Sequence, residues 1–197
     1  MARKLFGTDG VRGHAGEFLT AELALALGRA ATHETGRERP QVLIIRDTRE
    51  SGEMLEAALA AGVSAAGGDV LLSGVLPTPA APLLIGRYGF DLAAVISASH
   101  NPFHDNGIKF FAADGYKLSD ETELAIEWEL ARAVGETASA CQGGDDIAGV
   151  GAWGRSSGIG RVRELRGAPE DYLRELHVRF AELDLHGVDV LLDCANG

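Results

Sequence analysis

The first half of the sequence alternates between helical patterns and short apolar runs, and this alternation limits the fold more than any other feature. Apolar residues recur at helical spacing after Thr20, after Ser51 and after Pro77-Thr78-Pro79. Between these segments lie apolar runs with the length of buried strands, at residues 41–45, 69–72 and 92–96. Strands and helices alternating at this spacing predict an α/β fold with a largely parallel sheet and right-handed crossovers.

The pattern changes after residue 96. Residues 97–106 are polar, Asn106-Gly107 is a strong turn signal, and residues 108–111 have the character of a short returning strand, which would make the sheet mixed. Ser119 is placed to cap an acidic helix over residues 120–134. We expect two further elements, a helix over residues 169–180 and a strand over residues 188–192.

These elements predict a layered α/β/α domain followed by the start of a second, similar one. We expect the first domain to cover residues 1–142, a Gly-rich linker residues 143–165, and the incomplete second domain residues 166–197. One helix and one strand cannot close a hydrophobic core. We therefore expect either that the chain is a fragment or that another chain supplies the rest.

Composition narrows the class of protein. The net charge of 197 residues is −11, which argues against nucleic acid or an anionic membrane as the main partner. No apolar run is long enough for a membrane helix, and Cys141 and Cys194 are too few for a disulfide framework, so we expect a cytoplasmic protein. Residues 1–49 carry eight Lys or Arg against six Asp or Glu, so an anion site is expected there.

Two familiar patterns in the Gly-rich stretch are discounted. Residues 149–154 match the G-x-G-x-x-G pattern of dinucleotide sites, and residues 154–158 match the G-x-S-x-G pattern of hydrolases. Both patterns need a strand before them and a helix after them, and neither context is present. A flexible linker explains both.

The most informative polar stretch runs from Ile96 to Lys109, at the carboxyl end of an expected parallel strand, where open α/β sheets build ligand sites. A serine such as Ser99 can act as a nucleophile or phosphoryl carrier if its neighbours stabilise charge on its oxygen. His100, Asn101 and Lys109 could supply a donor, an orienting amide and a cation. Turn capping by Ser99 and Asn101 is an alternative, and a metal site of His100, His104 and Asp105 is a weaker one.

Two more clusters have the character of anion sites. Gly7 to Gly13 combines three glycines with Thr8, Asp9 and Arg12, and a glycine-rich backbone leaves N–H groups free to meet oxyanions. Arg46 to Gly52 lies between a strand end and a helix N-terminus. For Arg12, Asp47 and Arg49, an interloop salt-bridge network is an equal alternative to ligand contact.

Together these stretches resemble the α-D-phosphohexomutase superfamily. The resemblance rests on Phe6 to Gly13, Arg46 to Arg49, Pro77 to Pro79, and above all Ile96 to Pro102 with Asp105 to Lys109. It runs from residue 4 to residue 197 and includes the closing Asp-Cys-Ala-Asn-Gly. The Phe-Gly-Thr-Asp-Gly-Val-Arg-Gly opening is most similar to the bacterial branch that acts on glucosamine phosphates. His104 departs from the pattern, since an aromatic residue is usual there.

The resemblance implies an intramolecular phosphotransferase in which Ser99 is carried as phosphoserine. It would interconvert glucosamine 6-phosphate and glucosamine 1-phosphate through a bisphosphorylated sugar, in the supply of UDP-N-acetylglucosamine and peptidoglycan precursors. A Mg²⁺ ion is implied on the phosphoserine oxygen. The catalytic residues carried over are Ser99, Lys109, His100 and Arg12. The substrate or phosphate ligands carried over are Thr8, Arg12, Arg49 and Asn101.

The family's aspartate metal loop, sugar-selecting loop and distal phosphate loop would all lie beyond residue 197. We therefore expect this chain by itself to be inactive and its other metal ligands to be absent. A glucose or mannose phosphomutase of the same superfamily is one alternative, and a non-catalytic module that binds an anion or a partner is another. The expected partner is a hexosamine phosphate, not nucleic acid or membrane, and a homodimer stays open.

Overall fold

A mixed, largely parallel sheet forms the centre of the protein. The computed structural model describes residues 4–140 and 158–193. Within these ranges the sheet has the order β1-β5-β4-β2-β3-β6. Its strands are β1 (Val11–His14), β2 (Gln41–Arg46), β3 (Asp69–Val75), β4 (Leu92–Ile96), β5 (Asp105–Ala112) and β6 (Val162–Glu164). Strand β2 is parallel to β3 and β4, and β3 is parallel to β6, whereas β5 is antiparallel to β4 and β1.

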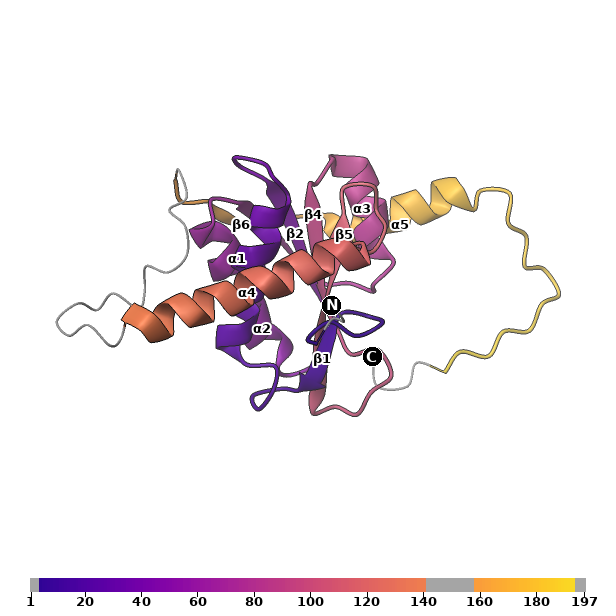
Figure 1. Ribbon diagram of the computed structural model, residues 1–197. Coiled ribbons are helices and arrows are strands. Elements are labelled where there is room, and N and C mark those ends of the chain that lie inside the picture. The colour runs from indigo at the N-terminus through magenta and orange to yellow at the C-terminus, as the bar shows by residue number, and fades with distance from the viewer. Residues whose placement is uncertain (1–3, 141–157, 194–197) are drawn as a thin grey trace.

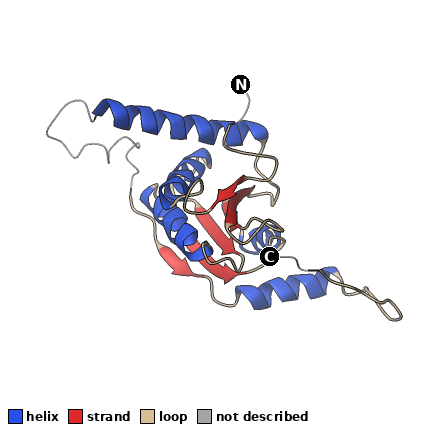
Figure 2. Cartoon of the chain, turned by 90° about the horizontal axis from the view of Figure 1, so that it is seen from below, coloured by secondary structure: helices blue, strands red, loops and turns tan. Residues whose placement is uncertain are grey.

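Helices cover both faces of the sheet, which confirms the predicted α/β/α layering (Figures 1 and 2). The described helices are α1 (Ala21–Glu34), α2 (Gly52–Ala65), α3 (Ala80–Tyr88), α4 (Asp120–Ala140) and α5 (Ala168–Arg179). One buried cluster joins the sheet to α1, α2 and α4, and includes Leu27, Leu59 and Ile126. A second cluster joins the opposite face to α3 and α5 through Leu84 and Ala168.

Local sequence signals explain where several helices begin. The Thr20 hydroxyl accepts a hydrogen bond from the amide of Leu23 at 3.2 Å, and the Ser119 hydroxyl accepts one from Thr122 at the same distance. In the middle of α4, the carboxylate of Glu127 accepts the backbone amides of Lys4, Leu5 and Phe6. Helix α4 thereby holds the amino-terminal segment that leads into β1.

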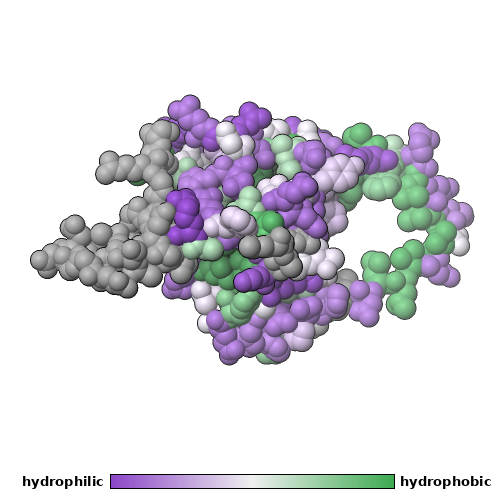
Figure 3. Space-filling model, in the orientation of Figure 1, coloured by the Kyte–Doolittle hydropathy of each residue, from purple (hydrophilic) through white to green (hydrophobic). Residues whose placement is uncertain are grey.

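Two expectations about local structure are wrong. Asn106-Gly107 lies inside β5 instead of forming a turn, because the chain turns earlier, where Asn101 N–H donates to Ala98 O and Asp105 N–H donates to Pro102 O. Residues 188–192 do not form a strand. A strand needs a neighbouring strand to satisfy its backbone groups, and no described strand pairs with this segment. Its side chains are exposed, with Leu191 at 96%. In Figure 3 the extended segment that follows α5 displays several hydrophobic residues on the surface.

The stretch expected to be a linker is only partly described. Residues 143–157 lie outside the described residues, and so do both discounted glycine patterns apart from Gly158. At its carboxyl end, Val162–Glu164 forms β6 at the edge of the sheet. Helix α5 then packs on α3, where Arg87 pairs with Asp171 at 3.0 Å and with Glu175 at 2.9 Å. In the described part of the chain, no helix is long and apolar enough to cross a membrane.

Candidate active site

The three polar clusters meet at the carboxyl end of β4. We call residues Ser97–His104, which follow this strand, the serine loop. The amide of Ser97 donates to the carbonyl of Gly107 at 2.9 Å, and Arg12 is the register partner of Gly107. The amide of Asp47 donates to the carbonyl of Ile96 at 3.0 Å. Antiparallel pairing of β1 with β5 and parallel pairing of β2 with β4 therefore bring the clusters together.

Glycine is required where these strands approach most closely. A Cβ on Gly107 would lie 2.7 Å from the carbonyl oxygen of Ser97 and 2.8 Å from Cγ of Arg12. A Cβ on Gly10 would lie 2.4 Å from the carbonyl oxygen of Ile108, and Gly10 has a φ of +84°. Both distances are too short for any side chain. Because glycine stands at both positions, the segment Gly7 to Gly13 can pack against β5 and against the start of the serine loop.

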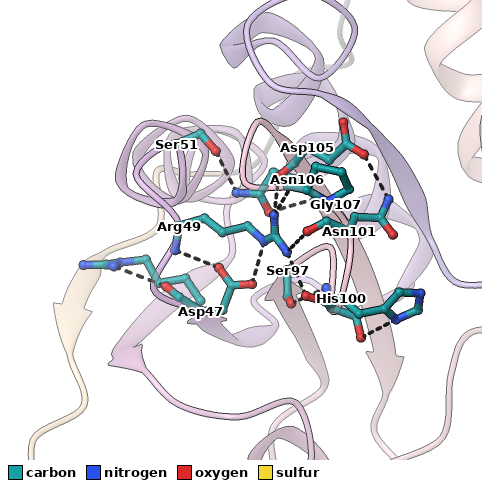
Figure 4. Close-up of polar contacts among 12 residues, drawn as sticks. Asp47, Arg49, Ser51, Ser97, His100, Asn101, Asp105, Asn106 and Gly107 are labelled. Atoms are coloured by element: carbon teal, nitrogen blue, oxygen red, sulfur yellow. Dashed lines mark hydrogen bonds and ion pairs between the residues drawn. The ribbon is translucent and has the colours of Figure 1, made fainter. Parts of the chain in front are cut away.

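Ser99 is exposed in the serine loop and has a strained backbone. Its φ of +56° is in the left-handed region, and among the described residues no other non-glycine residue has a positive φ. The Ser97 hydroxyl accepts the Ser99 amide at 3.0 Å. The Ser99 hydroxyl lies 3.5 Å from Nδ1 of His100, which is also exposed (Figure 4). The structure thus presents this hydroxyl to solvent beside an imidazole.

Arg49 is buried below the serine loop, with 5% of its surface exposed. Its Nε donates to Asp47 at 3.1 Å. The two terminal nitrogens donate to four backbone carbonyls of the loop and its exit: Pro102 at 2.6 Å, Asp105 at 2.9 Å, Ser99 at 2.7 Å and Asn101 at 2.9 Å (Figure 4). This arrangement favours the interloop network that the sequence left open over the contact of Arg49 with a phosphate.

Lys109 and Arg12 share the carboxylate of Asp9. The ammonium of Lys109 pairs with one oxygen and the Arg12 guanidinium pairs with the other. Burial tends to raise the pKa of Asp9, but the hydrogen bond and charge of Lys109, with the charges of Arg12 and Lys117, together hold it below its usual value. The Nε of Arg12 is buried and has no hydrogen-bond partner among the residues that the structure describes. The Asp9 group therefore carries a net positive charge and one unused N–H donor.

The other predicted site residues have structural contacts. Asn101 donates from its side chain to Asp105 at 3.0 Å, a contact that stabilises the serine loop. Thr8 is exposed, and its carbonyl accepts a hydrogen bond from Lys117 at 3.0 Å. Lys117 also pairs with the buried Glu123 at 3.1 Å. These contacts place Thr8 next to a cation that sequence analysis did not select.

Sequence analysis assigned no individual role to Asp9, whereas it included Asp47 in the alternative of an interloop salt-bridge network. Each aspartate lies two or three residues before an arginine that it binds, Arg12 or Arg49. This spacing was visible in the sequence and could have identified both pairs. Lys117 has no comparable signal, because only the hairpin after β5 brings it to Thr8.

An open hollow of about 470 Å³ lies beside the serine loop. His14, Thr48, Ser51, Phe103 and His104 are among the residues that line it. His104 stacks on His14 with ring centroids 4.9 Å apart. The family that the sequence resembles usually has an aromatic residue at this position. The imidazole of His104 keeps a ring contact with β1 in its place.

The described residues do not by themselves build a metal site. No group of three or more His, Cys, Asp or Glu side chains in these ranges is arranged to hold a metal ion. The alternative site of His100, His104 and Asp105 is therefore not supported. A phosphate on the Ser99 hydroxyl would add acceptor oxygens of the kind that Mg²⁺ binds.

Comparison with known proteins agrees with this geometry. Residues 3–135 match the family model described as Phosphoglucomutase/phosphomannomutase, alpha/beta/alpha domain I. The chain belongs to this family. A solved structure of a phosphoglucomutase/phosphomannomutase family protein from Burkholderia thailandensis superposes with a TM-score of 0.64 at 26% identity, over 84% of this chain and 34% of that one. This confirms the predicted phosphohexomutase resemblance and the fold class.

More similar relatives come from sequence comparison. The phosphoglucosamine mutase of Rhodospirillum centenum is 47% identical over 100% of this chain and 40% of its own length. That of Syntrophomonas wolfei is 48% identical over 98% of this chain and 41% of its own length. The chain thus spans about two fifths of the curated relatives that it matches.

Proposed function

We propose that the protein containing this chain is a phosphoglucosamine mutase that carries a phosphoryl group on Ser99. It interconverts glucosamine 6-phosphate and glucosamine 1-phosphate in the supply of UDP-N-acetylglucosamine and peptidoglycan precursors. The observation that carries the proposal is the exposed hydroxyl of Ser99, on a loop held from below by Arg49. The loop starts where Ser97 binds the carbonyl of Gly107, the register partner of Arg12, and Arg12 shares Asp9 with Lys109. The choice of glucosamine phosphate as the substrate rests on the names of the two relatives reported above.

The proposed reaction needs positioning and neutralisation of charge more than covalent chemistry by the protein. The bond between Ser99 Oγ and phosphorus breaks as a sugar hydroxyl oxygen bonds to phosphorus, and the proton of that hydroxyl ends on the released oxygen of Ser99. The bisphosphorylated sugar then turns over, and its other phosphate returns to Ser99. Lys109 takes part in proton transfer or charge stabilisation, Arg12 adds its positive charge beside it, and His100 orients the serine hydroxyl.

A Mg²⁺ ion on the phosphoserine oxygen belongs to the same proposal. It would neutralise negative charge on the transferred group. The described residues supply no complete set of ligands for it, so Ser99 is its one proposed ligand here and the remaining ligands belong to other parts of the protein.

The organisation of the whole protein is also a proposal. We propose that residues 1–142 form the phosphoserine-carrying domain, residues 143–165 a linker and residues 166–197 the beginning of a second domain. The end of this linker adds β6 to the sheet of the first domain, and α5 packs on α3 of the same domain. We propose a cytoplasmic enzyme whose partner is a hexosamine phosphate and not nucleic acid or membrane. For its assembly we propose a homodimer. The chain alone is proposed to be inactive.

A glucose or mannose phosphomutase is the second candidate, favoured by the description of the matching family model. Steady-state assays of the complete protein on glucosamine 6-phosphate, glucose phosphate and mannose phosphate separate the two. The highest kcat/KM on glucosamine 6-phosphate supports the first proposal, and a higher value on either of the other sugars replaces it.

Intact-mass analysis tests the phosphoserine and the non-catalytic alternative. Ser99→Ala in the complete protein should remove one covalent phosphate and abolish turnover. Ser73→Ala is the matched control, because among the described residues this hydroxyl donates to the carbonyl of Ile44 alone, and it should change neither. Full turnover in the Ser99→Ala protein would overturn the mutase mechanism and leave a binding module.

A further inference from the structure

Arg49 uses all of its hydrogen-bonding capacity within the protein. A guanidinium has five N–H donors and no acceptor. Asp47 takes the Nε–H, and the four terminal N–H groups match the four carbonyls of Ser99, Asn101, Pro102 and Asp105. The Arg49 side chain is 2% exposed. Neither a free donor nor an exposed surface is left for a substrate phosphate.

The four carbonyls come from both ends of the serine loop. Ser99 lies near its start and Asp105 is the first residue of β5, so one rigid guanidinium joins the loop's entry to its exit. Lysine could not replace it, because an ammonium group has three donors that diverge from a single point. The planar fork fixes the relative positions of these peptide groups.

Hydrogen bonds hold both backbone groups of the strained residue, Ser99. The amide of Ser99 donates to the Ser97 hydroxyl at 3.0 Å, and its carbonyl accepts from Arg49 at 2.7 Å. A left-handed conformation costs a non-glycine residue about 1–2 kcal/mol and persists only where surrounding contacts impose it. The bond from Arg49 is one of the two that impose it here.

Asp47 connects this arrangement to the sheet. Its backbone amide donates to the carbonyl of Ile96, the last residue of β4, and its carboxylate binds the amide and Nε of Arg49 at 3.1 Å each. The carboxylate also neutralises a charge that would be costly to bury alone. The serine loop begins at the end of β4. Through Asp47, the same strand end also sets the position of the Arg49 guanidinium that holds this loop.

We infer that Arg49, fixed by Asp47, is a positioning residue that sets the backbone of Ser99 for phosphoryl transfer without contacting the substrate. The inference rests on the proposed role of Ser99 as phosphoryl carrier. Phosphoryl transfer depends on alignment of the attacked and leaving oxygens, and a displacement of about 1 Å can cost about 100-fold in rate. Replacing the guanidinium of Arg49 should therefore lower the rate of the chemical step and leave the binding of the sugar phosphate intact.

The test compares Arg49→Lys with Arg46→Lys in the complete protein. Arg46 is the matched control, because it lies at the end of β2 and, in the described ranges, its ion pairs are with Glu53 and Glu56 of α2. Its one contact with Asp47 is a long hydrogen bond of 3.5 Å to the backbone carbonyl, among the same described residues. For Arg49→Lys we expect kcat to fall about 100-fold and KM to stay within about threefold, and for Arg46→Lys we expect both to stay within about threefold. A KM raised about tenfold with kcat kept would overturn the inference and make Arg49 a substrate ligand. An unchanged kcat would overturn it as well.

Hydrogen exchange of residues 97–105 provides a readout that does not depend on activity. Amides of the serine loop should exchange faster in Arg49→Lys than in Arg46→Lys, while β2 and β4 keep their protection. Unchanged loop exchange overturns the positioning role. If the unmodified protein shows no mutase activity, the proposed function fails, and this measurement still decides whether Arg49 holds the loop.

A second variant keeps the test valid if Arg49→Lys does not fold. Asp47→Asn retains the size of the side chain and removes the charge that orients Arg49. We expect a smaller loss of kcat, about tenfold, with KM kept and loop exchange raised. Wild-type kcat and wild-type loop exchange in this variant would contradict the inference.

Discussion

Asp9, at the start of the chain, pairs with Lys109 in β5. Arg12 binds the second oxygen of the same carboxylate. Pairing of β1 with β5 puts Arg12 opposite Gly107, so Arg12 and Lys109 project from the same face of the sheet. One carboxylate therefore sets the positions of both cations that we propose to act on the phosphoryl group.

Replacing Asp9 by Asn should weaken catalysis more than folding. The amide keeps the shape of the side chain but loses the charge that holds Lys109 and Arg12, so we expect kcat of the complete protein to fall about tenfold or more. Asp114→Asn is the control, because in the described part of the chain that carboxylate accepts the amide of Tyr116 in a turn and no other hydrogen bond. Equal kcat values in the two variants would show that Asp9 does not position the cations.

The lowered pKa of Asp9 predicts a contribution to stability at neutral pH that acid removes. The folded protein binds the proton of Asp9 less readily than the unfolded chain does, since Lys109 and Arg12 stabilise the carboxylate. This contribution is complete above the unfolded value of about 3.9 and is lost as the pH falls through the lowered folded value. The difference in urea-unfolding free energy between wild type and Asp9→Asn should therefore shrink from pH 7 to about pH 3. A constant difference would refute the linkage.

Gly10 and Gly16 offer a matched pair for the close approach of β1 to β5. Both have a φ of +84°, but a Cβ on Gly10 would meet the carbonyl of Ile108 at 2.4 Å, whereas one on Gly16 would meet nothing within 4 Å. Gly16→Ala should cost about 1 kcal/mol for backbone strain alone. Gly10→Ala should cost about 3 kcal/mol, because the steric clash adds to the strain. Urea unfolding of both variants measures the difference, and equal losses would refute the steric argument.

Ser99→Gly should stabilise the domain while abolishing phosphorylation. Glycine relieves the left-handed strain at a φ of +56° and loses part of this gain through the greater freedom of the unfolded chain, leaving a net gain of about 0.5 kcal/mol. Ser99→Ala keeps the strain and should leave stability unchanged. Chemical unfolding compares the two variants, and a Ser99→Gly protein less stable than Ser99→Ala would contradict the assignment of strain.

The sequence predicted the elements whose signals are local. The apolar runs gave β2, β3 and β4, Thr20 and Ser119 marked the starts of α1 and α4, and the run after Gly107 gave the returning strand. It failed at residues 188–192, where an apolar pattern alone cannot form a strand without a partner, and at β1, whose few residues carry no strand periodicity.

By itself, the sequence determined the α/β class, the family and the stretches in which polar chemistry is concentrated, because spacing, apolar periodicity and residue type are properties of the chain alone. Only the tertiary structure decided what each polar residue does. It buried Arg49 under four carbonyls of the serine loop, and it paired Asp9 with Lys109. Those roles follow from strand order and register, which place distant segments within hydrogen-bonding distance and are not encoded in any one segment.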